Sequence, residues 1–166
     1  MPVVPVGWLG SGTIKVKKRR AGSFAYIEYK GPYSKIPFDE AFSRLFTWAK
    51  ETRAGPGLKP FVIYASDPKR TPESELVTKV AIPIHRAGEP RGEIKVGQLP
   101  EMEIAVKRHD APAEEYDRSY AELQKWIADN GYEPYGAPIE VYTSKPKVRD
   151  GKTIIYSDIQ FPIRKK

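Results

Sequence analysis

The chain has 166 residues, of which 40% are apolar and 11% aromatic, so it can bury a sizeable core as one compact domain or as two small fused units. It has no cysteine and two histidines, His85 and His109, which excludes disulfides and zinc-finger spacings and gives no reason to expect a metal or another cofactor. No apolar run is long enough to span a bilayer and the opening residues do not resemble a secretion signal, so we predict a cytoplasmic protein.

The net charge of +7 is unevenly distributed along the chain. Residues 1–84 hold 14 basic and 7 acidic residues, whereas residues 85–166 hold 14 of each. The densest basic patch is KVKKRR at 15–20, which has no interleaved aromatic residues and no glycine-rich phosphate cradle around it. This pattern favours a solvated edge strand over a phosphate-binding site.

In chain order, the first predicted elements are an apolar and basic segment, IKV at 14–16, and a strand at 23–29. A helix follows, because apolar residues recur at helical spacing and Pro37 suits its first turn. Two alternating strands, starting at 60 and ending in apolar-Pro-Ile at 84, flank a polar loop at 66–75 and predict a hairpin. The apolar stripe of the helix consists of Phe38, Ala41, Phe42, Leu45, Trp48 and Ala49.

The same series then repeats, which predicts a duplicated fold. IKV returns at 94–96, a strand is expected at 103–109, and a second helix ends before Gly131, which suits a C-terminal cap. A second hairpin, with a polar loop at 144–152, ends in IQFPI at 159–163. The second helical stripe consists of Tyr116, Tyr120, Leu123, Trp126 and Ile127. Four residues of the first hairpin, Pro60, Tyr64, Ser66 and Pro68, return as Pro138, Tyr142, Ser144 and Pro146.

The repeat predicts an α+β fold for a single domain spanning residues 1–166. Its first copy covers about 14–84, its linker 85–93 and its second copy about 94–163. We expect a mostly antiparallel sheet with both helices on one face and a pseudo-twofold axis between the copies. The other face, concave because sheets twist, would carry a central ligand cleft. Trp8 precedes the repeat and is expected to plug an edge of the fold.

Strand alternation assigns side chains to the two faces of this sheet. We assume that the apolar sets face the helices, namely Phe61, Ile63, Ile139, Val141, Ile155, Ile159 and Phe161. The open face then receives an aromatic cluster that contains carboxylates. Its predicted ligand-binding residues are Tyr26, Glu28, Tyr64, Glu140, Tyr142, Tyr156 and Asp158.

Two carboxylates of the second copy, Glu140 and Asp158, make one wall of the predicted cleft acidic. The first copy has Val62 and Lys79 at the equivalent positions. Tyrosine faces and a partly desolvated carboxylate together favour a cationic or flat hydrophobic ligand. The structural alternative is an ion pair between Asp158 and Lys79.

The chain resembles the GyrI-like, or AraC-type effector-binding, domain family over residues 14–163. The resemblance rests on YIEYKGPYSKIPFDEAFSRLFTWA in the first copy and on YAELQKWIADNGY, PIEVYTSKP and YSDIQFPI in the second. It implies a tandem-repeat α+β fold with a central pocket for hydrophobic, often cationic, small molecules. Family members serve as effector modules of multidrug-responsive activators, as stand-alone gyrase-modulating proteins and, in some branches, as hydrolases of cyclopropane-bearing toxins.

Many family members carry the key acid of this pocket as a glutamate in a final strand of Thr-Glu-Ile type. This chain has Ser157, Asp158 and Ile159 there, so a shorter acid takes the place, and Glu140 on the neighbouring strand could substitute. We therefore expect a stand-alone binding protein for hydrophobic or cationic small molecules, related to transcription regulation, without room for a DNA-binding domain.

Two alternatives remain open from the sequence. The first is a hydrolase in which Asp158 or Glu140 activates water and the hydroxyl of Tyr156 donates a proton. The second is a modulator that contacts a topoisomerase or DNA through residues 15–20. Neither a membrane nor a nucleic acid is the favoured partner.

Overall fold

The structure is a computed structural model that describes residues 13–166. Within that range the chain forms nine strands and two α-helices, which confirms the predicted α+β class. Contacts between residues divide the chain into two compact units. Of the described residues, unit 1 comprises 13–19, Met102–Gly136 and Glu140–Lys166, and unit 2 comprises Arg20–Glu101 and Ala137–Ile139.

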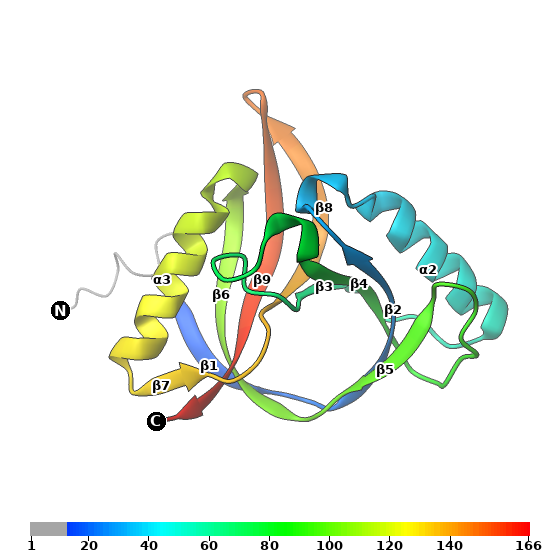
Figure 1. Cartoon of the computed structure of the whole chain (residues 1–166), viewed down its shortest axis with the longest axis horizontal. Helices are drawn as coiled ribbons and strands as arrows, with labels where there is room; N and C mark the ends of the chain where they lie inside the picture. Colours follow the sequence, from blue (N-terminus) through cyan, green and yellow to red (C-terminus); the bar gives the residue numbers. More distant parts are fainter. Residues whose placement is uncertain (1–12) are drawn as a thin grey trace. The chain divides into compact units, whose positions relative to one another are not determined.

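Unit 2 is an antiparallel sheet with one helix on one face. Its strands are hydrogen-bonded in the order β3-β4-β2-β5, and every pairing is antiparallel. The predicted helix and hairpin are confirmed, and Figure 1 shows the helix lying along β2 and β4. The elements are β2 (Gly22–Lys30), α2 (Phe38–Thr52), β3 (Phe61–Tyr64), β4 (Val77–Ile84) and β5 (Lys95–Leu99), with short 3-10 turns η1 (Tyr33–Lys35) and η2 (Glu73–Glu75).

The core of unit 2 forms because α2 buries the apolar stripe that its sequence predicts. Leu45 and Trp48 lie 0% and 1% exposed against β2 and β4, whose inward residues include Ile27 and Ile82. Burying a side chain of this size removes apolar area worth about 1.5–3 kcal/mol. Arg53 ends the helix in the left-handed region, with φ at 58°.

Unit 1 has the same plan, with strands in the order β1-β6-β9-β8 and the short β7 paired to β9. Leu123 and Ile127 of the helix are buried on Ile159 and Phe161 of β9. Gly131 follows the helix with φ at 79°, as expected for a C-terminal cap. The elements are β1 (Ile14–Arg19), β6 (Met102–Pro112), η3 (Ala113–Glu115), α3 (Tyr116–Asp129), β7 (Tyr132–Pro134), β8 (Ile139–Arg149) and β9 (Lys152–Lys165).

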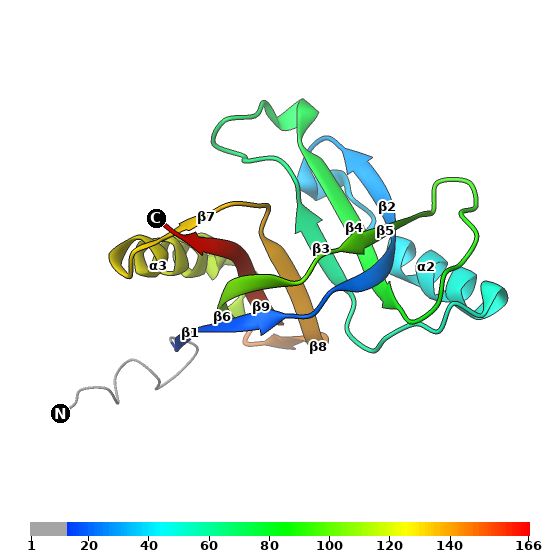
Figure 2. The same cartoon turned by 90° about the horizontal axis from the view of Figure 1, so that it is seen from below.

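Each unit takes its opening strand from the other copy of the repeat. β1, which contains the first IKV, pairs with β6 of the second copy. β5 begins at Lys95, within the second IKV segment, and pairs with β2 of the first copy. Figure 2 shows β5 and β2 side by side. The two IKV segments therefore have the same role, because each starts or lies in the edge strand of a unit built mainly from the other copy.

The second hairpin differs from the sequence-based expectation. The predicted polar loop at 144–152 is mostly strand, because β8 continues to Arg149 and β9 starts at Lys152. Asp150 and Gly151 form the whole turn, with φ at 50° and 76°. Two residues with positive φ make the tight turn that matches the twist of paired strands, and Asp-Gly is a favoured sequence for it.

Three further expectations concern the ends of the chain and its surroundings. Trp8 lies outside the described residues. Across residues 13–166, no helix combines the length and the apolar character needed to cross a membrane. The central cleft between the copies stays a prediction.

Candidate ligand-binding site

Glu140 of β8 is the centre of a buried polar cluster in unit 1. Its side chain is 4% exposed and lies on the same side of the sheet as α3. The hydroxyl of Tyr120, from α3, donates to Oε2 at 2.6 Å, and the hydroxyl of Tyr142 donates to Oε1 at 2.9 Å. A buried carboxylate is costly unless it accepts hydrogen bonds, so the two phenol groups make this placement tolerable.

Tyr116 extends the cluster along α3. Its hydroxyl lies 2.8 Å from the hydroxyl of Ser157, and its ring stacks on His109 with 4.0 Å between ring centroids. Burial raises the pKa of Tyr116 and the neighbouring Glu140 carboxylate raises it further, so Tyr116 is a neutral hydrogen-bond donor at physiological pH. We call Glu140, Tyr116, Tyr120 and Tyr142 the acid–tyrosine cluster.

His109 and Lys107 are two buried ionisable residues on this side of β6. His109 is fully buried, with Nδ1 2.8 Å from the hydroxyl of Ser119 and Nε2 3.2 Å from the carbonyl of Pro112. Burial lowers the pKa of His109, so the imidazole is neutral. Lys107 is 2% exposed and its Nζ lies 3.4 Å from Glu122 of α3.

The predicted distribution of side chains over the two faces of β8 and β3 is wrong. Glu140 and Tyr142 lie on the helix side, not on the open side, because Tyr120 of α3 reaches Glu140. In β3, Phe61 contacts Phe24 on the face opposite α2, so Tyr64 lies on the helix side with Tyr33, at 5.1 Å between ring centroids.

The physical reason is that both faces of these two strands are buried. In β3, Phe61, Val62 and Ile63 are 1%, 0% and 8% exposed, so both faces of the strand carry buried apolar side chains. In β8, Ile139 and Val141 are also almost fully buried. Alternation indicates the core side of a strand only where the other side meets water.

In β9 the predicted distribution is confirmed. Ile159 and Phe161 pack under α3, so Tyr156 and Asp158 lie on the face opposite the helix. The carboxylate of Asp158 accepts a hydrogen bond from Nε of Arg108 at 2.6 Å, so Arg108 and not Lys79 is its ion-pair partner. Asp158 and Glu140, expected on one wall, therefore lie on opposite sides of the sheet of unit 1.

The remaining predicted residues belong to unit 2. Tyr26 lies on the face opposite α2, where Nζ of Lys79 sits 5.0 Å from its ring centroid and the tilted ring of Phe24 lies 5.3 Å away, centroid to centroid. Glu28 is exposed and is paired across the strands with Lys79. Neither side chain joins Tyr64, which faces the other way.

Two residues of the acid–tyrosine cluster were placed in the helical core stripe from the sequence. Tyr116 and Tyr120 do occupy core-facing positions of α3, but their hydroxyls bind Ser157 and Glu140. The sequence contained an indication of this, since a buried tyrosine hydroxyl usually finds a polar partner.

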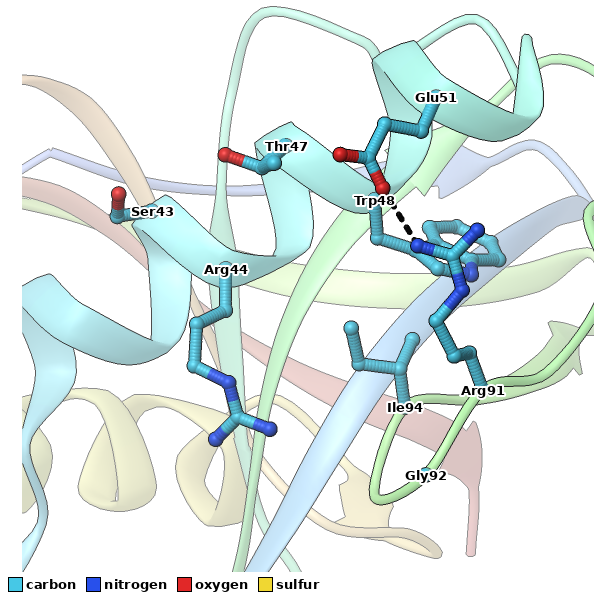
Figure 3. Close-up of a pocket in the computed structure, with 8 residues that line it drawn as sticks. All are labelled: Ser43, Arg44, Thr47, Trp48, Glu51, Arg91, Gly92 and Ile94. Carbon is cyan, nitrogen blue, oxygen red and sulfur yellow. Dashed lines mark hydrogen bonds and ion pairs between the residues drawn. The ribbon is translucent and has the colours of Figure 1, made fainter.

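A separate open pocket of about 380 Å³ lies on unit 2, between α2 and the segment before β5. Figure 3 shows the ion pair between two of its lining residues, Arg91 and Glu51. Their charged atoms lie 2.5 Å apart, and Arg44 pairs with Glu93 at 3.2 Å. Both guanidinium groups are thus already neutralised by carboxylates. None of the predicted ligand-binding residues lines this pocket, whose lining is Ser43, Arg44, Thr47, Trp48, Glu51, Arg91, Gly92 and Ile94.

Two strand–helix–hairpin copies, each with one helix packed on an antiparallel sheet, define a duplicated class of α+β protein. A scan against protein families matches residues 12–164 to the GyrI-like small molecule binding domain. The chain belongs to this family, whose role is to bind a small molecule. A search of curated proteins found no match.

Solved structures with the same fold share little sequence with this chain. The EcmrR C-terminal domain aligns at a TM-score of 0.70 and 20% identity, covering 93% of this chain and 98% of that one. In the EcmrR–DNA complex the TM-score is 0.72 at 19% identity, covering 93% of this chain, which spans 58% of the EcmrR chain. A Listeria innocua protein described as a hydrolase encoded by lin2189 aligns at 0.66 and 14%, covering 97% and 96%. SAV2435 bound to tetraphenylphosphonium aligns at 0.51 and 10%, covering 92% and 94%.

Proposed function

We propose that the protein binds a small organic cation with a hydrophobic body, and that Glu140 recognises its positive charge. The observation that carries this proposal is the placement of a 4% exposed carboxylate among the hydroxyls of Tyr120 and Tyr142. An anion in a low-dielectric, aromatic environment attracts a cation more strongly than the same anion in water. The buried side chains of His109 and Ser157 hold Tyr116 in place beside it.

Preorganisation supports this assignment of roles within the acid–tyrosine cluster. Tyr116 is fixed by its stack on His109 and by its contact with Ser157, so it does not need to be ordered when a ligand binds. Interactions with groups that are already ordered cost less conformational entropy on binding. Asp158, with its ion pair to Arg108, is assigned a structural role, and Tyr156 next to it has no part in charge recognition.

The test is a titration of the protein with tetraphenylphosphonium, the cation present in the SAV2435 structure, and with tetraphenylborate, an anion of the same shape. We expect micromolar binding of the cation, about −8 kcal/mol, and much weaker binding of the anion. Glu140→Gln keeps a hydrogen-bond acceptor but removes the charge. Tetraphenylphosphonium has no hydrogen-bond donor, so its attraction to Glu140 is coulombic. At an effective dielectric constant of about 20 and a separation of about 6–8 Å it is roughly 2–3 kcal/mol, so this variant should weaken binding of the cation about 30- to 100-fold.

Asp158→Asn is the matched control, because it removes one carboxylate from the opposite side of the same sheet. We expect its dissociation constant to change less than about threefold, which is below 1 kcal/mol. Circular dichroism would confirm that both variants are folded. Equal losses in the two variants, or equal binding of the phosphonium and the borate by the wild type, would contradict recognition by Glu140.

A hydrolase is the second candidate, favoured by one observation. Glu140 lies 2.9 Å from the Tyr142 hydroxyl, so a carboxylate and a proton donor are adjacent. The carboxylate would accept a proton from water as the water oxygen bonds to an electrophilic carbon, while a tyrosine hydroxyl donates its proton to the leaving atom. Turnover of a cyclopropane-bearing electrophile that is lost in both Glu140→Gln and Tyr142→Phe would support this function, whereas stable binding without product would exclude it for that substrate.

A further inference from the structure

The tip of the β8–β9 hairpin carries a row of cations on one face. The two strands run out together to the turn at Asp150 and Gly151, as Figure 1 shows. Residues 144–153 are all exposed. Lys145, Lys147 and Arg149 alternate along β8, so their side chains leave the same face at intervals of about 6.8 Å.

Lys152 of β9 belongs to the same row. Because the turn has two residues, Lys152 is directly opposite Arg149 and their side chains share a face. Like charges directly opposite each other destabilise a pair of strands. The pair of cations at 149 and 152 therefore does not contribute to the stability of the hairpin. We call Lys145, Lys147, Arg149 and Lys152 the hairpin cations.

The charge of this row is not balanced within the part of the chain that the structure describes. No acidic side chain of residues 13–166 lies within ion-pair distance of any of the hairpin cations. Asp150 lies in the turn itself. On the same face further down the sheet, Asp158 is bound by Arg108 at 2.6 Å and Asp110 lies 3.7 Å from the same guanidinium.

The first copy of the repeat shows that the fold does not require this charge. Its equivalent connection, SDPKRTPESE at 66–75, carries two cations, Lys69 and Arg70, and three carboxylates. Asp67 accepts a hydrogen bond from the Lys69 backbone and lies 3.8 Å from Arg70. The same position in the two copies therefore has a net negative charge in one and a net positive charge in the other.

We propose that the hairpin cations form a sequence-independent binding surface for the phosphate backbone of duplex DNA. A two-stranded β-ribbon fits the major groove, and regularly spaced cations without an acidic neighbour match a partner that presents a dense row of negative charge. An acidic protein is less suitable, since protein interfaces need a buried apolar or aromatic centre. The cation-bearing face of the tip offers none, and the exposed Val148 points to the other side.

Electrostatic guarding of a sheet edge is the competing explanation, because lysine and proline on an edge strand prevent edge-to-edge aggregation. It makes a different prediction. A guard needs charge but no particular partner, so its removal promotes aggregation and leaves DNA affinity unchanged. A phosphate-binding row contributes a defined number of counterions released on binding.

The experiment is a fluorescence anisotropy titration of a labelled duplex of about 20 base pairs with the full chain at several salt concentrations between about 50 and 200 mM. Four phosphate contacts contribute about −3.6 to the slope of log K against log salt, which is about 150-fold in affinity over this range. The variant K145Q/K147Q/R149Q/K152Q should lose that contribution. The control K50Q/K59Q/K69Q/R70Q removes the same total charge from exposed positions of unit 2 and should keep it.

Three results would overturn the proposal. They are a wild type that does not bind the duplex, a hairpin variant with an unchanged salt slope, and poly-glutamate bound as tightly as DNA. An unchanged salt slope would indicate that DNA binds at the basic segment 15–20 and not at the hairpin. Tight binding of poly-glutamate would indicate that the partner of the hairpin is an acidic protein. Thermal melts by circular dichroism verify folding, and the hairpin variant should melt no lower than the wild type because a repulsive pair is removed. A variant that aggregates yet binds DNA normally would establish edge guarding instead.

Discussion

The buried imidazole under α3 predicts a specific loss of stability on mild acidification. His109 is 0% exposed, its Nε2 lies 3.2 Å from the carbonyl of Pro112, and its Nδ1 lies 2.8 Å from the hydroxyl of Ser119. These contacts suit a neutral ring that donates from Nε2 and accepts at Nδ1. Burial lowers the pKa of His109 and is partly offset by backbone hydrogen bonds to Pro112 and Ala111, while Lys107 lowers the pKa and Glu115 raises it by smaller amounts.

The direction of the pH effect follows from this lowered pKa. In the unfolded chain the imidazole takes up a proton as the pH falls through about 6.5, whereas the folded protein resists protonation. The stabilisation is therefore fully present above pH 6.5 and is lost progressively below it. If His109 stays neutral in the folded state, lowering the pH from 7.5 to 5.5 reduces the free energy of unfolding by about 1.4 kcal/mol. This is the largest change that one imidazole with an unfolded pKa of about 6.5 can cause over this pH interval.

Urea denaturation at several pH values measures how the free energy of unfolding depends on pH. The dependence near neutral pH can be assigned to a residue because the chain has two histidines. The only other histidine is His85, which is exposed. His85→Gln should keep the wild-type dependence on pH, while His109→Gln should flatten it whatever its own stability. A wild type equally stable at both pH values, or a dependence that disappears in His85→Gln instead, would refute the assignment of a neutral buried imidazole.

Two further predictions test the cores of the two units. In unit 1, Leu123→Ala should lower the free energy of unfolding by about 2–5 kcal/mol because its side chain is fully buried, whereas Leu58→Ala, at a 96% exposed position, should change it by less than about 0.5 kcal/mol. In unit 2, Gly88→Ala should cost about 1–3 kcal/mol because a Cβ there would lie 2.6 Å from the Trp48 ring, while Gly22→Ala meets no atom within 4 Å and should be neutral. Chemical denaturation checks both pairs, and a loss in either control equal to that of its partner would contradict the packing described.

Several elements could be predicted because their signals are local. Helix α2 follows from the spacing of Leu45 and Trp48, and the end of α3 follows from Gly131. The family could also be recognised from local signals, because the order of strand, helix and hairpin occurs twice along the chain. Local periodicity depends only on backbone geometry, which is the same in every fold.

The faces of β3 and β8 could not be predicted in this way. Phe61 and Tyr64 exchanged sides relative to the expectation because both faces of their strand are buried, so hydrophobicity did not distinguish them. The length of the second hairpin was also missed. The sequence at 144–149 is polar, as in a loop, and became strand because Asp150 and Gly151 permit a two-residue turn.

By itself the sequence determined the duplicated α+β plan, the two helices and the presence of a carboxylate among tyrosines on the second hairpin. Only the tertiary structure decided that Glu140 is buried with Tyr120 and Tyr142, and that Asp158 pairs with Arg108 on the other side of the sheet. The reason is physical. Periodicity along a strand is set by its own residues, but which face of the strand is covered, and by what, depends on chain segments far away in the sequence.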